Sequence, residues 1–243
     1  MRIQLLADVH SNLNALHAVL RDAEARGPVE ALWCLGDLVN YGPDPGPCLK
    51  VLREQGALSI MGNHDAAAVG ALPTEDFSLD AAAAMVWTQA QLTVDEAEFL
   101  SALPVTVERE DCTLVHGSLR GPLWEYLVTP QDAEQSFLLL NTPLCLIGHT
   151  HLPSVFLWSD GHCSGAYLRS EDSIEVTGKR LIYNPGGVGQ PRDGDPRASY
   201  ALFDTGRGTI THYRVEYNIA AVQERMAAAG LPDHLIGRLA RGR

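Results

Sequence analysis

The chain has 243 residues, of which 46% are hydrophobic, and this length can bury an extensive core in one large domain. Its formal net charge of −12 repels the backbones of nucleic acids, so we expect neither general binding to DNA or RNA nor stable binding to a duplex. Its five cysteines include no Cys-x-x-Cys pair, which argues against a disulfide framework and thiolate-bound zinc and suits a reducing cytoplasm.

Short apolar runs recur along the chain and close on Gly, Asp, Asn or His. Their hydrophobicity is continuous rather than alternating, which is typical of strands buried on both faces. We expect strands over residues 3–8, 31–37, 57–63, 112–118, 144–149, 180–186 and 200–204. None approaches the roughly 20 apolar residues that cross a bilayer, and Asp8 interrupts the segment that a signal peptide would need. We therefore expect a cytoplasmic protein without a membrane segment.

The segment between the first two strands, residues 11–27, has the pattern of an amphipathic helix. Ser11 or Asn12 can cap its N-terminus, an apolar stripe follows at helical spacing, and Gly27 ends it. The helix and its flanking strands form a β-α-β unit.

Residues 66–110 contain two Ala-rich helical patterns, the second capped by Thr93 with Glu96 three residues later. We interpret this region as a helical insertion or lid. A further helix is expected over residues 131–140.

The chain beyond residue 154 consists of shorter apolar segments that alternate in hydrophobicity and are separated by Gly and Asp turns. This pattern predicts a second, mainly antiparallel sheet, and the segment after Asn218 looks helical. No repeat or linker interrupts the chain, so we predict a single domain over residues 1–243. The predicted fold class is α/β: a sandwich of two packed sheets flanked by helices.

Polar side chains follow the ends of the predicted strands. Because strand carboxyl ends converge on one crevice of an α/β sheet, we expect these side chains to meet. They are Asp8, His10, Asp37, Asn63, His64, His116, His149 and His151. Imidazole with carboxylate or amide oxygen suits divalent first-row ions, Mn²⁺ above all, with Fe, Zn, Ni or Co as alternatives. Without His64, seven ligands exceed what one ion needs and suit two, with one carboxylate as a bridge.

The order of these motifs resembles that of the calcineurin-like metallophosphoesterases. The motifs are DVHSN at 8–12, GDLVNYGPDP at 36–45, GNHD at 62–65, VHGS at 115–118 and GHTH at 148–151. The chain is most similar to a compact bacterial branch with a late NPGSVGQPRDGDPRASY segment, here NPGGVGQPRDGDPRASY at 184–200. The resemblance spans nearly the whole chain and implies a four-layer sandwich with a dinuclear metal centre.

The resemblance also implies a role for each site residue. Asp8, His10 and His151 are expected to bind the first ion, and Asn63, His116 and His149 the second, with Asp37 bridging them. A hydroxide held between the ions would attack phosphorus. His64 resembles the family's non-ligand histidine, which contacts the phosphoryl group and can protonate the leaving oxygen. Asp65 is expected to set the tautomer of His64.

Several residues near the motifs have two interpretations. Asn12 caps a helix or also lines the substrate site, and Arg192 contacts a phosphate or lies in a plain surface loop. Asn40 either touches substrate or caps the helix that begins near Pro45, and the cap is the favoured interpretation. Tyr41 stacks on a base or simply packs.

The leading functional hypothesis is a phosphodiesterase acting on a small phosphorylated or nucleotide-derived substrate. The few cationic side chains near the motifs, chiefly Arg120 and Arg192, favour diesters over the more highly charged monoesters. The alternatives are a phosphomonoesterase, a dinucleoside polyphosphate hydrolase, and a catalytically silent scaffold of the same fold. The sequence carries no indication of an oligomeric state.

Overall fold

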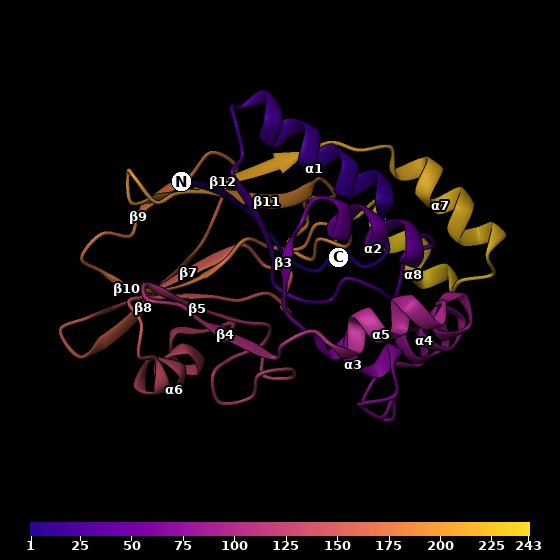
Figure 1. Ribbon diagram of the computed structural model, residues 1–243, viewed down its shortest axis with the longest axis horizontal. Coiled ribbons are helices and arrows are strands. Elements are labelled where there is room, and N and C mark those ends of the chain that lie inside the picture. Colours follow the sequence, from indigo (N-terminus) through magenta and orange to yellow (C-terminus); the bar gives the residue numbers. More distant parts are fainter.

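The computed structural model describes residues 1–243 and contains two six-stranded sheets (Figure 1). The first sheet has the order β3-β2-β1-β11-β12-β9 and the second β4-β5-β6-β10-β7-β8. The strands of the first sheet are β1 (Arg2–Leu6), β2 (Ala31–Cys34), β3 (Leu58–Ser59), β9 (Ser173–Glu175), β11 (Ala198–Asp204) and β12 (Thr209–Val215). Those of the second are β4 (Thr106–Glu108), β5 (Cys112–Val115), β6 (Leu144–Leu146), β7 (Ser154–Ser159), β8 (His162–Tyr167) and β10 (Arg180–Asn184).

Each sheet joins a parallel part to an antiparallel part. In the first sheet, β1, β2 and β3 are parallel, β11 runs antiparallel to β1, and β12 runs antiparallel to β11. In the second sheet, β5, β6 and β10 are parallel, and β4, β7 and β8 run against their neighbours. The carboxyl ends of β1, β2 and β3, and those of β5 and β6, carry the polar motifs.

The helices cover the outer faces of the two sheets. They are α1 (Leu13–Ala25), α2 (Pro45–Glu54), α3 (Asn63–Ala68), α4 (Leu79–Gln91), α5 (Val94–Ser101), α6 (Pro130–Leu139), α7 (Ile219–Ala228) and α8 (Asp233–Leu239). Helix α1 packs on β11 and β12, and α6 packs alone on β7 and β8 of the second sheet (Figure 1). The predicted sandwich of two sheets flanked by helices is confirmed.

Three apolar clusters explain why the strand sequences are continuously hydrophobic. Ile3, Leu5 and Tyr183 lie between the two sheets, whereas Leu6 faces the helices of the first sheet and Ile182 faces α6. Neighbouring residues of one strand are thus buried on opposite faces, as expected for a sheet covered on both sides.

The prediction that all strands beyond residue 154 form a separate sheet is wrong. Strands β7, β8 and β10 join β4–β6, whereas β9, β11 and β12 complete the sheet that begins at the N-terminus. Strand β11 lies beside β1 because Tyr200 and Leu202 complete the cluster under α1. Such pairing depends on contacts almost 200 residues apart, which alternation within a segment does not report.

Two boundaries also differ from the sequence expectation. Strand β3 has only two residues, because the chain turns into helix α3 directly at Asn63. Within the predicted helical region 66–110, β4 at Thr106–Glu108 belongs to the second sheet. The helix predicted at 131–140 is confirmed as α6, which Thr129 and Asp132 cap reciprocally.

None of the helices combines the length and hydropathy that crossing a bilayer requires.

Candidate metal centre

The polar residues that follow five different strands meet at one rim of the sandwich. Their metal-ligating atoms form two groups, each with all atoms within 4.8 Å of one another. The first group contains Asp8, His10, Asp37 and His151, and the second contains Asp37, His116 and His149. Asp37 is common to both. The structure therefore brings together the predicted residues in the predicted partition, with Asp37 between the two halves.

Asn63 completes the second group. Its Oδ1 lies 3.2 Å from Nε2 of His116, and the residue is 1% exposed. Asn63 is the first residue of helix α3, so the start of the helix holds its side chain against the cluster.

The loops that carry these residues adopt a backbone conformation that residues other than glycine rarely adopt. Five of the seven expected ligands have positive φ angles: Asp8 at 54°, His10 at 46°, Asp37 at 56°, His149 at 65° and His151 at 58°. Backbone hydrogen bonds from Asp8 N to Gly36 O and from His10 N to Asp37 O, both 3.0 Å, hold two of these loops together. Strain of this kind concentrates at functional sites, where surrounding structure maintains it.

Each carboxylate of the cluster uses one oxygen for the protein and leaves the other without a partner. Oδ1 of Asp8 accepts a hydrogen bond from His149 N at 3.1 Å, and Oδ1 of Asp37 accepts one from His64 N at 2.9 Å. Oδ2 of both residues is buried and has no hydrogen-bond donor. An unpaired buried carboxylate oxygen is costly, so both oxygens are suited to bind a cation.

Backbone carbonyls determine the tautomers of three imidazoles. Nδ1 of His10, His116 and His151 lies 3.1, 2.7 and 2.5 Å from the carbonyl oxygens of Val39, Leu35 and Gln190. Because a carbonyl only accepts, each Nδ1 carries the proton and each Nε2 presents a lone pair to the cluster.

His149 has the opposite arrangement. Its Nε2 lies 3.2 Å from the carbonyl oxygen of Trp124, which leaves Nδ1 as the nitrogen that is free to bind an ion.

The arrangement fits two bound cations. Nε2 of His10 lies 3.2 Å from Nε2 of His151, and both nitrogens are unprotonated in the tautomers described above. Two lone pairs at this distance repel each other unless a positive charge binds both. Nε2 of His116 and Oδ2 of Asp37 are likewise 3.2 Å apart. The donor set, imidazole with carboxylate and amide oxygen, suits first-row divalent ions.

The pKa values of the buried carboxyl and imidazole groups also indicate that a positive charge stabilises this cluster. Burial raises the pKa of the Asp8 carboxyl to about 7. Asp37 is equally buried, but the charges of His116 and His64 hold its pKa well below the usual value. Burial acts to lower the pKa of His116, yet Asp37 more than offsets it and raises that pKa to about 9. Without an ion, a proton on His116 supplies the positive charge that the carboxylates attract.

The partner of His64 is Asn40, not Asp65, so that part of the sequence interpretation is wrong. Nδ1 of His64 lies 2.7 Å from Nδ2 of Asn40. An amide NH₂ only donates, so Nδ1 accepts and the ring proton is on Nε2, which lies 4.0 Å from Oδ2 of Asp37. Asp65 instead accepts hydrogen bonds from the backbone N–H groups of Leu38 and Gly62 at 2.8 and 2.9 Å, and it holds the two motif loops together.

The favoured interpretation of Asn40 as a helix cap is also wrong, because Asp44 occupies the N-cap of α2. Asn40 is fully buried, and its φ of 75° turns the side chain inward, away from that helix. The signal in the sequence was an amide three residues after Asp37, one of the expected ligands.

The two residues expected to contact substrate, Asn12 and Arg192, differ in whether their polar atoms already have hydrogen-bond partners in the protein. Oδ1 of Asn12 accepts from Ala15 N at 3.1 Å as the N-cap of α1, and its Nδ2 donates to Gly189 O at 2.9 Å. Its donors and acceptor thus have protein partners. Arg192 lies near the hydroxyl of Tyr41 at 3.4 Å and has no carboxylate partner. Its guanidinium charge acts on Asp8, His10 and His64.

Asn184 is a residue of the site region that the sequence interpretation missed. It ends β10, and its Nδ2 donates to Gly148 O at 2.6 Å and to Oγ1 of Thr150 at 3.0 Å. It thereby supports the turn that carries His149 and His151. The signal was available, because Asn184 is a polar residue at a strand end, like the expected ligands.

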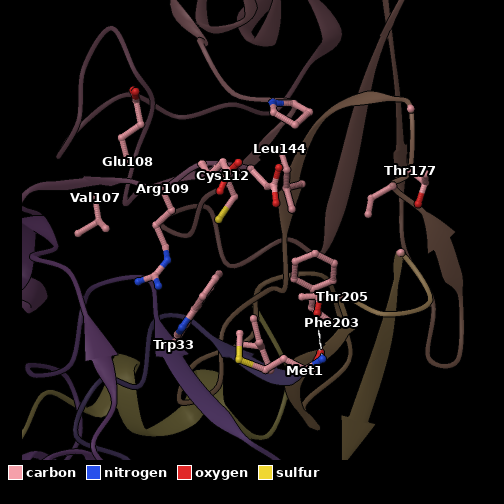
Figure 2. Close-up of a pocket in the computed structure, with 17 residues that line it drawn as sticks. Met1, Trp33, Val107, Glu108, Arg109, Cys112, Leu144, Thr177, Phe203 and Thr205 are labelled. Carbon is pink, nitrogen blue, oxygen red and sulfur yellow. Dashed lines mark hydrogen bonds between the residues drawn. The ribbon is translucent and has the colours of Figure 1, made fainter.

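A cavity of about 870 Å³ lies elsewhere, between the N-terminal ends of β1 and β6. Figure 2 shows Trp33, Arg109 and Phe203 along its wall, and the Arg109 guanidinium lies 5.5 Å from the centre of the Trp33 ring. None of the clustered ligands lines it. This cavity is therefore separate from the candidate metal centre.

The family model of the calcineurin-like phosphoesterase superfamily domain matches residues 1–208. The chain belongs to the calcineurin-like phosphoesterase superfamily. The crystal structure of a metallophosphoesterase from Sphaerobacter thermophilus has 43% sequence identity and a TM-score of 0.91, covering 100% of this chain and 99% of that one. An uncharacterized protein of Methanocaldococcus jannaschii is 36% identical over 247 residues, covering 99% of this chain and 98% of that protein.

A more distant relative carries a more specific name. A symmetrical bis(5′-nucleosyl)-tetraphosphatase of Vibrio cholerae is 26% identical over 145 residues, which cover 57% of this chain and 52% of that protein. The match thus spans about half the length of that relative. Family membership makes this calcineurin-like phosphoesterase an enzyme of the metallophosphoesterase class, and its buried Asp and His groups can hold two metal ions.

Proposed function

We propose that this phosphoesterase is a phosphodiesterase that hydrolyses small or nucleotide-derived diesters. The observation that carries the proposal is the pair of ligand groups that share Asp37, with the protonated Nε2 of His64 directed to the same carboxylate. Asp8, His10 and His151 would hold one cation, Asn63, His116 and His149 the other, and Asp37 both. When bound, the two divalent ions, manganese in our proposal, supply Lewis acidity toward phosphoryl oxygens and lower the pKa of water.

The chain's own residues perform the remaining tasks. His64 is the proposed proton donor, because Asn40 holds the ring with its N–H toward the cluster. Burial lowers the pKa of His64 to about 4, so the ring is neutral and gives up its Nε2 proton only to a strongly basic group. A departing alkoxide is such a group, and protonation by a positioned side chain contributes roughly 10²–10⁴-fold.

The charge around the cluster supports a diester. Arg192 is the cation beside the site that lacks a carboxylate partner, whereas Arg120 is paired with Glu125 and its side chain is 55% exposed. A guanidinium matches phosphate oxygens geometrically, so we assign Arg192 to the non-bridging oxygens of the substrate. Asn12 then acts by holding Gly189 and the turn of the 184–200 loop rather than by binding substrate.

The dinucleoside polyphosphate hydrolase remains the second candidate, because the Vibrio cholerae relative has that name. Such a substrate carries several phosphates and would need more than one free cation near the ions. A panel of cyclic nucleotides, linear dinucleotides and dinucleoside polyphosphates separates the two candidates by their kcat/KM values.

The first test measures hydrolysis of bis-p-nitrophenyl phosphate by enzyme loaded with Mn²⁺, with and without EDTA. We expect turnover that EDTA abolishes and Mn²⁺ restores, and a lower kcat/KM for the monoester p-nitrophenyl phosphate. The variant His64→Ala should keep its manganese and lose most turnover of alkyl diesters. Activity indifferent to EDTA, or a preference for the monoester, contradicts the proposal.

A further inference from the structure

The candidate metal centre is closed to solvent. Each of the seven expected ligands is at most 2% exposed, and His64 is 4% exposed. A phosphate ester is much larger than a water molecule, so it reaches these residues only if part of the covering structure moves. The residues that cover the cluster are therefore also the residues that an entering substrate meets first.

Four aromatic rings, here named the aromatic cover, pack directly on the site histidines. Ring centroids of Tyr41 and Phe77 lie 4.6 and 4.7 Å from that of His64. The Tyr126 ring stacks on His149 at 4.0 Å with an interplanar angle of 17°. Trp124 approaches the same histidine at 6.4 Å, edge to face.

The cover is built from separate segments and has a seam between two of them. Phe77 belongs to the connection between α3 and α4, and Trp124 and Tyr126 belong to the connection between β5 and α6. Across the seam, the rings of Phe77 and Trp124 meet at 5.1 Å with an angle of 65°. Opening the seam exposes two aromatic faces beside the metal-ligating residues.

The segment that carries Phe77 is largely exposed and is held to the protein mainly by Leu72 and Phe77, which pack on the apolar cluster of the first sheet. Between Gly70 and Leu79, Phe77, Leu72 and Thr74 are half-buried, whereas most of their neighbours are exposed. Its backbone bonds are local, such as that from Phe77 N to Thr74 O at 3.0 Å. Because no backbone hydrogen bond joins this segment to a strand, Phe77 can move away from His64 without breaking the pairing of either sheet.

The position of the seam identifies the part of the substrate that it contacts. Phe77 packs edge-on against His64, the proposed proton donor to the leaving oxygen. A leaving group attached to that oxygen lies beside His64, within reach of Phe77 and, across the seam, of Trp124. Flat rings at this position stack on a nucleobase or another aryl group, because every such group presents a π face.

We propose that Phe77 and Trp124 form a gate whose opening admits the diester and whose exposed rings then stack on an aromatic leaving group, such as the base of a nucleoside. This inference rests on the proposed phosphodiesterase function and specifies its substrate class. Tyr126 remains stacked on His149 and forms the fixed side of the opening.

The test compares two substrates whose leaving groups are both alkoxides. Deoxyadenylyl-(3′→5′)-deoxyadenosine releases a nucleoside that has a base, and the methyl ester of deoxyadenosine 3′-phosphate releases methanol. We expect the wild-type enzyme to prefer the first substrate, and Phe77→Leu and Trp124→Ala to lower kcat/KM for it by roughly ten- to a hundredfold. The methyl ester should change less than about threefold, since the methanol that it releases has no base to stack on the gate.

Conservative and distant variants serve as controls. Phe77→Tyr keeps an aromatic ring and should retain the wild-type preference for the dinucleotide over the methyl ester. Phe99 is a half-buried phenylalanine on α5, remote from the cluster. The variant Phe99→Leu should leave kcat/KM unchanged for both substrates. Equal losses on the two substrates in the gate variants indicate a merely structural role and overturn the proposal.

Binding gives a second readout that is independent of turnover. Adenosine 5′-monophosphate should quench tryptophan fluorescence in the wild-type protein and in Trp158→Phe, but not in Trp124→Phe. A quench that persists in Trp124→Phe contradicts the assignment.

The outcomes distinguish the gate from the function on which it rests. An enzyme inactive on bis-p-nitrophenyl phosphate with Mn²⁺ refutes the phosphodiesterase itself. An enzyme active on that diester that cleaves neither nucleoside substrate, or shows no preference for the base, refutes only the gate.

Discussion

Asn40 lies between His64, Ala81 and Thr88, and its side chain contacts all three. Nδ2 is 2.7 Å from Nδ1 of His64 and 3.3 Å from the carbonyl oxygen of Ala81, and Oδ1 accepts from Thr88 at 3.4 Å. An amide in this position has only donors to offer to His64, so it selects the tautomer with the proton on Nε2. The chemical role of one residue is thus defined by another residue 24 positions away.

Replacing Asn40 by Leu tests that role. The variant removes the donor at Nδ1 and releases His64 from one tautomer, so kcat for diesters with alkyl leaving groups should fall by about tenfold or more. Diesters that release p-nitrophenolate need little protonation and should change much less. Steady-state kinetics over a series of leaving groups provides the measurement.

Thr88→Val is the matched control, because it alters a contact of Asn40 without touching His64. If the loss in Asn40→Leu is the same for every leaving group, the residue acts only in packing.

At the scale of single elements, short loops after parallel strands hold the site together. Gly62, the N-cap of α3, has a φ of −96°, which any residue adopts. Its importance is spatial: a Cβ at this position would collide with the carboxylate of Asp37. The helix start can approach the Asp37 carboxylate closely because Gly62 has no side chain.

Gly62→Ala should therefore displace Asp37 and weaken both proposed metal sites. We expect manganese content after gel filtration to fall below that of the wild-type protein, with activity reduced by about tenfold or more, since even small displacements at such a site are costly. Overpacking should also lower the free energy of unfolding by about 1–3 kcal/mol.

The control for this element is Gly206→Ala, whose Cβ would lie 3.4 Å from Asp204, an ordinary contact. Full metal content and activity in Gly62→Ala would show that Asp37 does not depend on the close approach.

At the scale of the whole molecule, buried polar contacts tie the antiparallel strands to the loop beneath the metal centre. His212 on β12 is fully buried, with Nδ1 3.0 Å from Arg169 O and Nε2 2.8 Å from Oγ of Ser199. Oγ of Ser199 also lies 2.5 Å from the carbonyl oxygen of Pro185. Burial lowers the pKa of His212 to about 4, below the roughly 6.5 of an unfolded chain.

This shift predicts a loss of stability in acid. The unfolded chain takes up a proton at His212 below pH 6.5, whereas the folded protein does so only near pH 4. Stabilisation is therefore complete above about pH 6.5 and is lost as the pH falls toward 4, by about 2 kcal/mol between pH 7 and 4.5.

Urea unfolding of His212→Asn in EDTA at these two pH values should show a smaller acid loss than the wild-type protein. The exposed His17, changed to Asn, is the control and should behave as wild type. Equal acid losses in His212→Asn and wild type would contradict the assignment.

Sequence-based prediction succeeded for features with a local signature. The strand ends at Asp8, Asp37 and His116, the cap at Thr93 and each of the five motifs are all recognised from a few consecutive residues. Hydrophobic continuity correctly indicated strands covered on both faces, since that pattern records burial of neighbouring side chains.

What only the tertiary structure decided concerns partners distant in the chain. The sequence by itself determined the fold class, the types of the expected ligands and their placement at strand ends. It did not determine that β11 pairs with β1, that Asn40 rather than Asp65 contacts His64, or that Phe77 meets Trp124. The physical reason is that a residue's identity limits which bonds it can form, whereas the packing of whole sheets determines which partner lies within reach.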